Sequence, residues 1–242
     1  MPSAVVPRYA PAVFARPIPV VVGLGLLLGS GLLACQRPPP DADVAPTDAP
    51  APAPEDPMEV YEGLEAKIAE GSDTEDDRKD ALERVRAIED DGSPQYAFAR
   101  AAIVGRVAEL RGIKAGKLVT EAEQYAKLSM DRDPQWRDRA AARMLGTLWV
   151  MAPGRLLEHG DSETGISMLE ELAESAPDVV ENQLRLGEAY LFFGDPESAG
   201  EPLCRARAGR DALRPDEAAL LDKLIAEAEE EGPLPCADAN PS

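Results

Sequence analysis

The chain has 242 residues, of which 25 are Lys or Arg and 45 are Asp or Glu, so its net charge at pH 7 is −20. Such acidity argues against nucleic acid as a partner and against a domain that lies flat on anionic lipid. With one histidine and three cysteines, the sequence contains no His pair, no HExxH motif, no catalytic triad of the usual kind and no zinc-ligand spacing.

These absences lead us to expect no enzyme, no metal and no cofactor. A carboxylate pair suited to glycoside chemistry stays open among the 45 acids. Nothing in the sequence singles such a pair out.

Residues 1–34 are predicted to be a secretory signal. Arg8 and Arg16 are the only charged side chains before an apolar run from Val20 to Leu33. This run is shorter than the roughly 20 residues that a bilayer crossing needs, and glycines interrupt it. The alternative is an uncleaved N-terminal membrane anchor.

The run ends in Leu32-Leu33-Ala34-Cys35, which resembles a bacterial lipobox cut after Ala34. The lipoprotein class implies that Cys35 becomes the N-terminus and carries the acyl chains, such as palmitate, that bind the lipid membrane. Cleavage removes two arginines and no acid, so the mature chain would carry a net charge of −22. Gln36 stands where an aspartate would signal retention, so the resemblance implies the periplasmic face of the outer membrane. Exposure at the cell surface is the alternative.

Residues 35–57 are rich in Pro, Ala and Asp and are predicted to be a disordered tether. Such a segment cannot bury a core and extends at about 3.1 Å per residue, so it would hold the domain away from the lipid surface. A ligand for an SH3-like module is the alternative function for a Pro-rich segment.

Apolar periodicity with helix start and stop signals predicts an all-α domain over residues 58–231 and a tail over 232–242. We count four helical pairs and a terminal cap helix. The clearest start and stop signals are Gly71, Thr74, Gly92, Ser93-Pro94, Gly112, Gly116, Asp133-Pro134, Pro177-Asp178, Asp195-Pro196 and Pro215. Asp133 and Asp178 are each predicted to cap the helix that follows.

Two copies of one helix-turn-helix pattern can be aligned between Leu145 and Ala206. The second copy reads Leu186-Gly187, Tyr190, Gly194-Asp195, Ala199, Leu203 and Ala206. The first reads Leu145-Gly146, Trp149, Gly160-Asp161, Leu169, Leu172 and Pro177-Asp178. This pattern resembles the tetratricopeptide (TPR) repeat. The resemblance implies an α-α helical-repeat, TPR-like solenoid that acts as a binding scaffold and names no ligand.

The first copy contains an insertion. Its Leu-Gly pair lies 41 residues before that of the second copy, whereas the Gly-Asp turns lie 34 apart. Seven extra residues in the segment 151–159 must therefore lengthen the first helix or form a loop, and Pro153-Gly154 favours a loop. The loop could bind a ligand, or it could simply close a hydrophobic edge with Leu156 and Leu157.

The second copy departs from the family pattern at Gly200 and Pro202. An interior proline costs a helix about 3 kcal/mol, so a kink or an early helix start is expected there.

The resemblance also implies which side chains line the concave groove. They are Arg143, Thr147 and Met151 in the first copy, and Arg185, Glu188 and Phe192 in the second. Two arginines in an acidic chain suit a carboxylate ligand. The alternative is that all six are ordinary solvated groove residues.

Two cysteines remain in the mature domain, Cys204 and Cys236. In an oxidising compartment two leftover thiols usually pair, so a disulfide closing a loop of about 30 residues is predicted. The alternative is a buried Cys204 and a free Cys236.

The lipobox, the tether, the helical pairs and the Ala152-Pro153 insertion before Gly160-Asp161 resemble the T-component lipoproteins of tripartite periplasmic (TRAP) transporters. That likeness implies a periplasmic solute-binding protein as partner, a homo-oligomer and a small organic acid as ligand. Three functions follow: an envelope scaffold that binds protein segments, a transport accessory, and a structural or assembly lipoprotein of the outer membrane.

Overall fold

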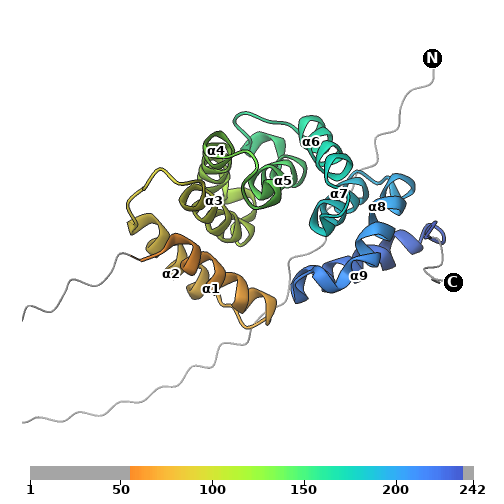
Figure 1. The fold of residues 1–242 in the computed structure, drawn as a ribbon, viewed down its shortest axis with the longest axis horizontal. Helices are drawn as coiled ribbons and strands as arrows, with labels where there is room; N and C mark the ends of the chain where they lie inside the picture. The colour runs from red at the N-terminus through yellow and green to blue at the C-terminus, as the bar shows by residue number, and fades with distance from the viewer. Residues whose placement is uncertain (1–54, 237–242) are drawn as a thin grey trace, which may run out of the picture. The chain divides into compact units, whose positions relative to one another are not determined.

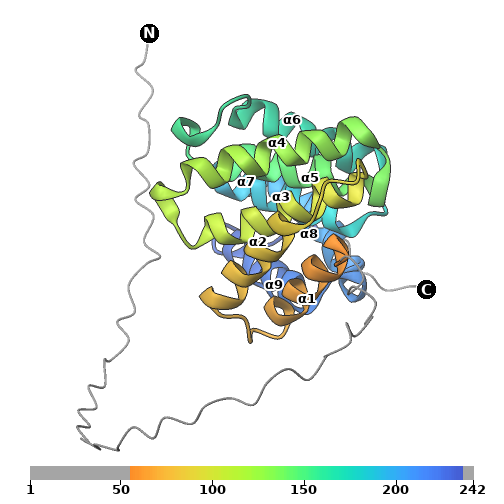
Figure 2. The same ribbon diagram turned by 90° about the vertical axis from the view of Figure 1, so that its left-hand side faces the viewer.

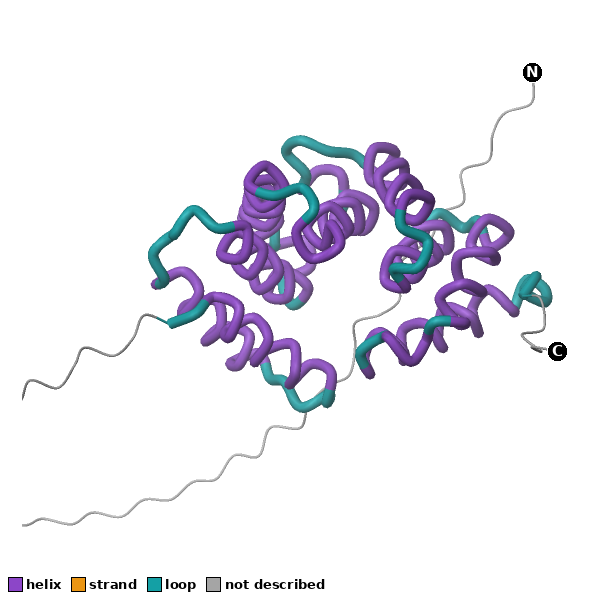
Figure 3. Tube along the Cα trace, in the orientation of Figure 1, coloured by secondary structure: helices purple, strands orange, loops and turns teal. Residues whose placement is uncertain are grey.

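The computed structural model describes residues 55–236. In this range the chain forms nine α-helices, three short 3-10 helices and no strand, which confirms the all-α prediction (Figures 1 and 3). The α-helices are α1 (Pro57–Ala69), α2 (Glu75–Ala87), α3 (Pro94–Glu109), α4 (Gly116–Arg132), α5 (Trp136–Met151), α6 (Ser162–Ser175), α7 (Val180–Phe192), α8 (Pro196–Ala208) and α9 (Pro215–Glu229). The 3-10 helices are η1 (Gly112–Lys114), η2 (Gly154–Leu156) and η3 (Arg210–Ala212).

The predicted signal peptide, Cys35 and all but the last three residues of the predicted tether lie outside the described residues. Those last residues already belong to the helical domain, because Asp56 caps α1 and Pro57 is its first residue. The end of the tail, residues 237–242, also lies outside the described range.

Several helix starts follow directly from capping side chains. Thr74 and Asp77 form a capping box at the start of α2, and the Ser93 hydroxyl accepts a hydrogen bond from the Tyr96 amide at 3.1 Å. Asp161 and Asp195 cap α6 and α8 in the same way. The predicted starts at Thr74, Ser93-Pro94 and Asp195-Pro196 are confirmed.

The predicted caps at Asp133 and Asp178 are wrong. The Asp133 carboxylate accepts a hydrogen bond from the Gln135 amide at 2.9 Å, so it closes a turn before α5 instead of capping the helix. Helix α7 begins at Val180 without a side-chain cap. The first turn of α5 is also left-handed, with φ between 49° and 60° over residues 137–139.

Neighbouring helices pack as antiparallel pairs, most extensively α3 with α4, α5 with α6 and α7 with α8. Glycine allows the close approach in both aligned copies. A Cβ on Gly146 would lie 3.1 Å from Leu169 Cδ2, and a Cβ on Gly187 would lie 2.6 Å from Leu203 Cδ2. The two Leu-Gly pairs therefore have the same packing role.

The segment between α5 and α6 is a loop with one turn of 3-10 helix, as predicted. Leu156 and Leu157 pack against Ala108, Ala115 and Val119 and so close the apolar edge between α3 and α4. In the second copy, Pro202 does not end the helix, because α8 runs through it from Pro196 to Ala208.

The first and last helices of the domain also touch. Helix α1 contacts α9, and in Figure 1 their ends approach each other at the bottom of the view. Figure 2 shows α1 and α9 side by side from another direction. This contact joins the two ends of the row of helical pairs.

Candidate functional site

Helices α5 and α7 pack against each other and carry all six residues predicted to line the groove. We call these residues the α5/α7 face: Arg143, Thr147, Met151, Arg185, Glu188 and Phe192. Five of the six side chains are partly buried, whereas 56% of Phe192 is exposed.

The Arg143 guanidinium is held by two neutral acceptors. Its Nη1 donates to Asn182 Oδ1 at 2.8 Å and to the backbone oxygen of Asp138 at 3.2 Å. Within residues 55–236 no carboxylate lies within ion-pair distance of Arg143. Burial lowers the pKa of Arg143 and the charge of Arg185 adds to this effect, whereas the more distant carboxylates of Glu181, Glu217 and Asp138 oppose it without cancelling it. A desolvated cation of this kind is suited to binding an anionic group.

Asn182 is fully buried and orients Arg143. Its amide nitrogen donates to the backbone oxygen of Leu172 at 3.1 Å, which directs the amide oxygen toward the guanidinium. Asn182 is not among the site residues predicted from the sequence. The available signal was its position one turn before Leu186, where a polar residue interrupts an apolar stripe.

Arg185, by contrast, is already neutralised. It donates to Glu188 at 2.8 Å and lies 3.4 Å from a carboxylate oxygen of Glu217 on α9. The two arginines therefore differ, because only Arg143 has no carboxylate within ion-pair distance in residues 55–236.

The other predicted groove residues have separate roles. The Thr147 hydroxyl donates to the backbone oxygen of Arg143 at 2.9 Å, and Met151 packs with Tyr190 against the core between α5 and α7. Phe192 meets Phe193 edge to face, with ring centroids 5.9 Å apart. These two rings form an exposed aromatic pair at the end of α7.

A buried carboxylate holds the insertion loop in place. Glu123 on α4 is fully buried and accepts hydrogen bonds from Trp149 Nε1 at 3.0 Å and from the backbone amides of Glu158 at 3.1 Å and His159 at 3.0 Å. Burial alone would raise the pKa of Glu123, but these donors and the nearby Lys127 outweigh burial and lower it. Glu123 thus binds the loop backbone through two hydrogen bonds, while His159 is exposed.

A second buried carboxylate joins α1 to α3 and α9. Glu65 accepts two hydrogen bonds from Arg106, at 2.7 and 2.8 Å, and another from Arg214 just before α9. Burial alone would raise the pKa of Glu65, but the two arginines outweigh it and lower the pKa. Beside this cluster, Asp216 Oδ1 is buried without a hydrogen-bond partner.

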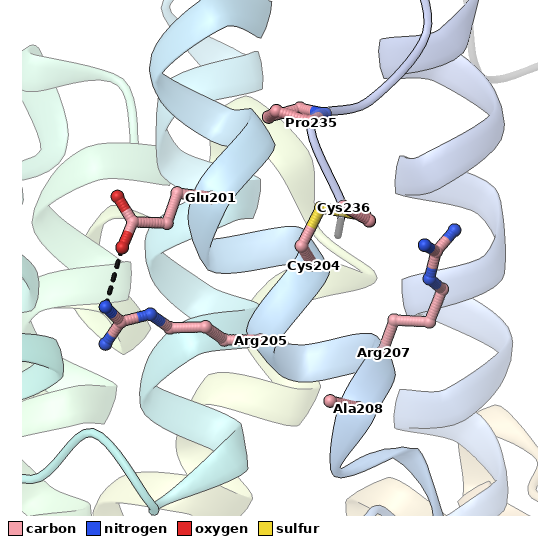
Figure 4. A pocket seen from close by; sticks show the side chains of 7 residues that line it. All are labelled: Glu201, Cys204, Arg205, Arg207, Ala208, Pro235 and Cys236. Atoms are coloured by element: carbon pink, nitrogen blue, oxygen red, sulfur yellow. Dashed lines mark hydrogen bonds and ion pairs between the residues drawn. A yellow bond between two sulfur atoms is a disulfide. The ribbon is translucent and has the colours of Figure 1, made fainter. Parts of the chain in front are cut away.

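A disulfide joins Cys204 on α8 to Cys236 in the tail, with a Cα–Cα distance of 5.1 Å. It holds Pro235 against Gly200, where an added Cβ would lie 2.9 Å from the proline ring. An open hollow of about 530 Å³ lies beside this bond. Figure 4 shows Arg205 and Arg207 on opposite sides of the disulfide. Arg205 is paired with Glu201 at 2.6 Å.

No protein-family model matches this chain, and no curated protein matches it significantly in sequence. Among residues 55–236 no helix is both long and apolar enough to span a bilayer. The same residues contain no cluster of three or more His, Cys, Asp or Glu side chains that could hold a metal ion.

Proposed function

We propose that this chain is a lipid-anchored, TPR-like scaffold of the bacterial cell envelope that recognises a segment of a partner protein on the α5/α7 face. The observation that carries this proposal is the environment of Arg143. Matching Gly-Leu contacts pack the two helical pairs, and Arg143 lies on the α5/α7 face between them. Its guanidinium is desolvated and has no carboxylate within ion-pair distance in the described part of the chain, and the buried Asn182 orients it. This arrangement suits the recognition of an anionic group on a peptide.

The lipobox at Cys35 and the Pro-rich tether support an envelope location for this scaffold. We place it at the periplasmic face of the outer membrane. Acyl groups on Cys35 can be detected by mass spectrometry of the protein purified from membranes.

The two buried carboxylates support recognition in preference to chemistry. Glu65 and Glu123 both have lowered pKa values because arginines or hydrogen-bond donors stabilise their charged forms. A carboxyl that acts as a general acid at neutral pH needs the opposite shift.

Affinity capture from crosslinked cells tests the proposal. The wild-type chain is expected to retain an envelope protein that Arg143→Ala loses, whereas Lys223→Ala, which removes an exposed cation on α9, retains it. Recovery of no envelope protein by the wild-type chain would count against a scaffold. Recovery of outer-membrane assembly proteins would assign the scaffold to that machinery.

A transport accessory that binds a small organic acid is the second candidate, because one unmatched arginine also suits a free carboxylate. Titration calorimetry with small organic acids is expected to show binding that Arg143→Ala weakens about tenfold to a hundredfold, as expected for a lost charged hydrogen bond. Arg185→Ala should have a smaller effect, since Glu188 and Glu217 already neutralise that side chain. Unchanged affinity in both variants would remove this candidate.

A further inference from the structure

Most basic side chains in residues 55–236 form ion pairs with acids of the same range, as expected for so acidic a chain. Six do not, and three of these six lie together at one edge of the domain. The six are Lys114, Lys117, Arg143, Arg155, Arg207 and Lys223.

The three neighbouring cations come from two segments that contact each other. Lys114 ends η1 and Lys117 lies in the first turn of α4, whereas Arg155 lies in η2 of the insertion loop. The Leu156 side chain would lie 3.6 Å from a Cβ on Gly116, so the loop packs directly on the start of α4. All three cations are exposed.

Exposed apolar side chains lie beside these cations. Ile113 is 71% exposed and Leu110 is 42% exposed, which are unusual values for large hydrophobic residues in this domain. From residue 110 to residue 120 the chain contains no acid and three basic residues, of which Lys114 and Lys117 are unpaired and Arg111 lies 3.4 Å from a carboxylate oxygen of Glu75. We call Leu110, Arg111, Ile113, Lys114, Lys117 and Arg155 the basic edge.

We propose that the basic edge docks onto an anionic phospholipid surface. Cations attract anionic headgroups, while Ile113 and Leu110 can enter the boundary between headgroups and acyl chains. Only this edge of the domain would touch the bilayer, so the contact differs from a domain that lies flat on anionic lipid. The repulsion between anionic headgroups and acids elsewhere on the domain is screened beyond a Debye length of about 8 Å at physiological ionic strength.

This inference rests on the proposed lipid anchor only because the anchor keeps the domain close to the membrane. The roughly 20 residues between Cys35 and α1 reach about 60 Å when extended, which lets the domain turn any edge toward the membrane. The anchor therefore permits the contact, and the charges and apolar side chains of the edge select it.

Hydrogen exchange measured by mass spectrometry tests the contact. The acylated chain is placed in nanodiscs of phosphatidylcholine alone or of phosphatidylcholine with phosphatidylglycerol. Amides of residues 110–118 and 153–157 should be protected only on the anionic bilayer. Replacing Lys114 and Lys117 by Gln should lower the docking equilibrium constant about 30-fold and remove this protection. Lys223→Gln is the matched control, because it removes an exposed and unpaired cation on α9.

Equal exchange in the two bilayers, or the same loss of protection in the Lys223→Gln control, would overturn the proposal. If the amides of the basic edge are protected from exchange only when an acidic protein is added, the edge binds that protein and the lipid proposal is rejected. If the chain purified from membranes carries no acyl groups, the proposed anchor is refuted. Binding of that chain to preformed anionic vesicles would still test the basic edge. If the unsubstituted chain captures its partner but does not dock on the anionic bilayer, only the basic edge is refuted.

Discussion

Glu123 shows how one carboxylate can determine the structure of a loop. It accepts hydrogen bonds from the Trp149 indole and from two loop amides, all at distances near 3 Å, and without it the buried indole would lose its acceptor. The loop in turn carries Arg155 of the basic edge. The buried side chain of Glu123 therefore helps to position the basic edge, although Glu123 is not part of that surface.

We predict that Glu123→Gln destabilises the domain by about 1 to 3 kcal/mol near pH 7, because an amide cannot accept all three hydrogen bonds. The pKa of Glu123 is lowered in the folded state from an ordinary value of 4.5. Its contribution is therefore present above the unfolded pKa and is lost as pH falls through the folded pKa. Urea unfolding of both proteins should show a difference that shrinks below about pH 4.5. A difference that stays constant from pH 7 to pH 3 would contradict this.

The residues that organise the site were the hardest to predict from sequence. Arg143 was identified by its offset in the repeat, but its partner Asn182 was not, and neither was Glu123. Glu65 pairs with Arg214, 149 residues away, and no local pattern connects such residues. The sequence predicts which faces are apolar and does not show which buried polar groups meet across them.

At the scale of elements, the sequence predicted helix existence and most starts correctly, because caps and prolines act locally. The exception is the start of α5. Arg137, Asp138 and Arg139 have φ values of 49°, 52° and 60°, in a region that disfavours side chains. Each residue reaches a different neighbour: Arg137 pairs with Glu62 on α1, the Asp138 oxygen accepts from Arg143, and Arg139 pairs with Glu171 on α6. These three contacts accompany the left-handed turn, and the local sequence pattern that predicts a right-handed start contains no sign of them.

Glycine substitution tests the left-handed turn. Asp138→Gly should stabilise the domain by about 1 kcal/mol, because glycine adopts positive φ without the steric cost. The control is Glu83→Gly, at an exposed position inside the regular helix α2, where glycine should cost about 0.5 to 1 kcal/mol. Thermal unfolding should therefore show shifts of opposite sign. Destabilisation by both substitutions would show that residue 138 is not left-handed.

The tail depends on its disulfide. Cys204 and Cys236 are 32 residues apart, and a crosslink of that span stabilises by about 3 to 4 kcal/mol in the entropic model. Replacing both cysteines by serine should lower the free energy of unfolding by that amount and increase hydrogen exchange in residues 232–236. A mass that does not change by two hydrogens on reduction, or unchanged stability, would show that the pair is not formed.

At the scale of the whole helical domain, the contact between α1 and α9 is the feature that no repeat pattern predicts. Glu65 on α1 stabilises this contact by accepting a hydrogen bond from Arg214, directly before α9. Arg106 on α3 donates to the same carboxylate. We predict that Glu65→Gln lowers the free energy of unfolding by about 2 to 3 kcal/mol and increases exchange in α1 and α9 together. Glu62→Gln, which breaks only an exposed pair, should cost less than about 1 kcal/mol. Equal effects of the two substitutions would contradict the closing role of Glu65.

The central claim is that the α5/α7 face recognises a partner, and photo-crosslinking in living cells tests it most directly. A photoreactive phenylalanine analogue replaces Thr147 on this face or, as the control, Glu174 on α6, whose side chain is exposed. The account predicts a discrete crosslinked envelope protein from position 147 and none from position 174. Crosslinks of equal yield at both positions, or none at position 147 in a folded protein, would contradict it.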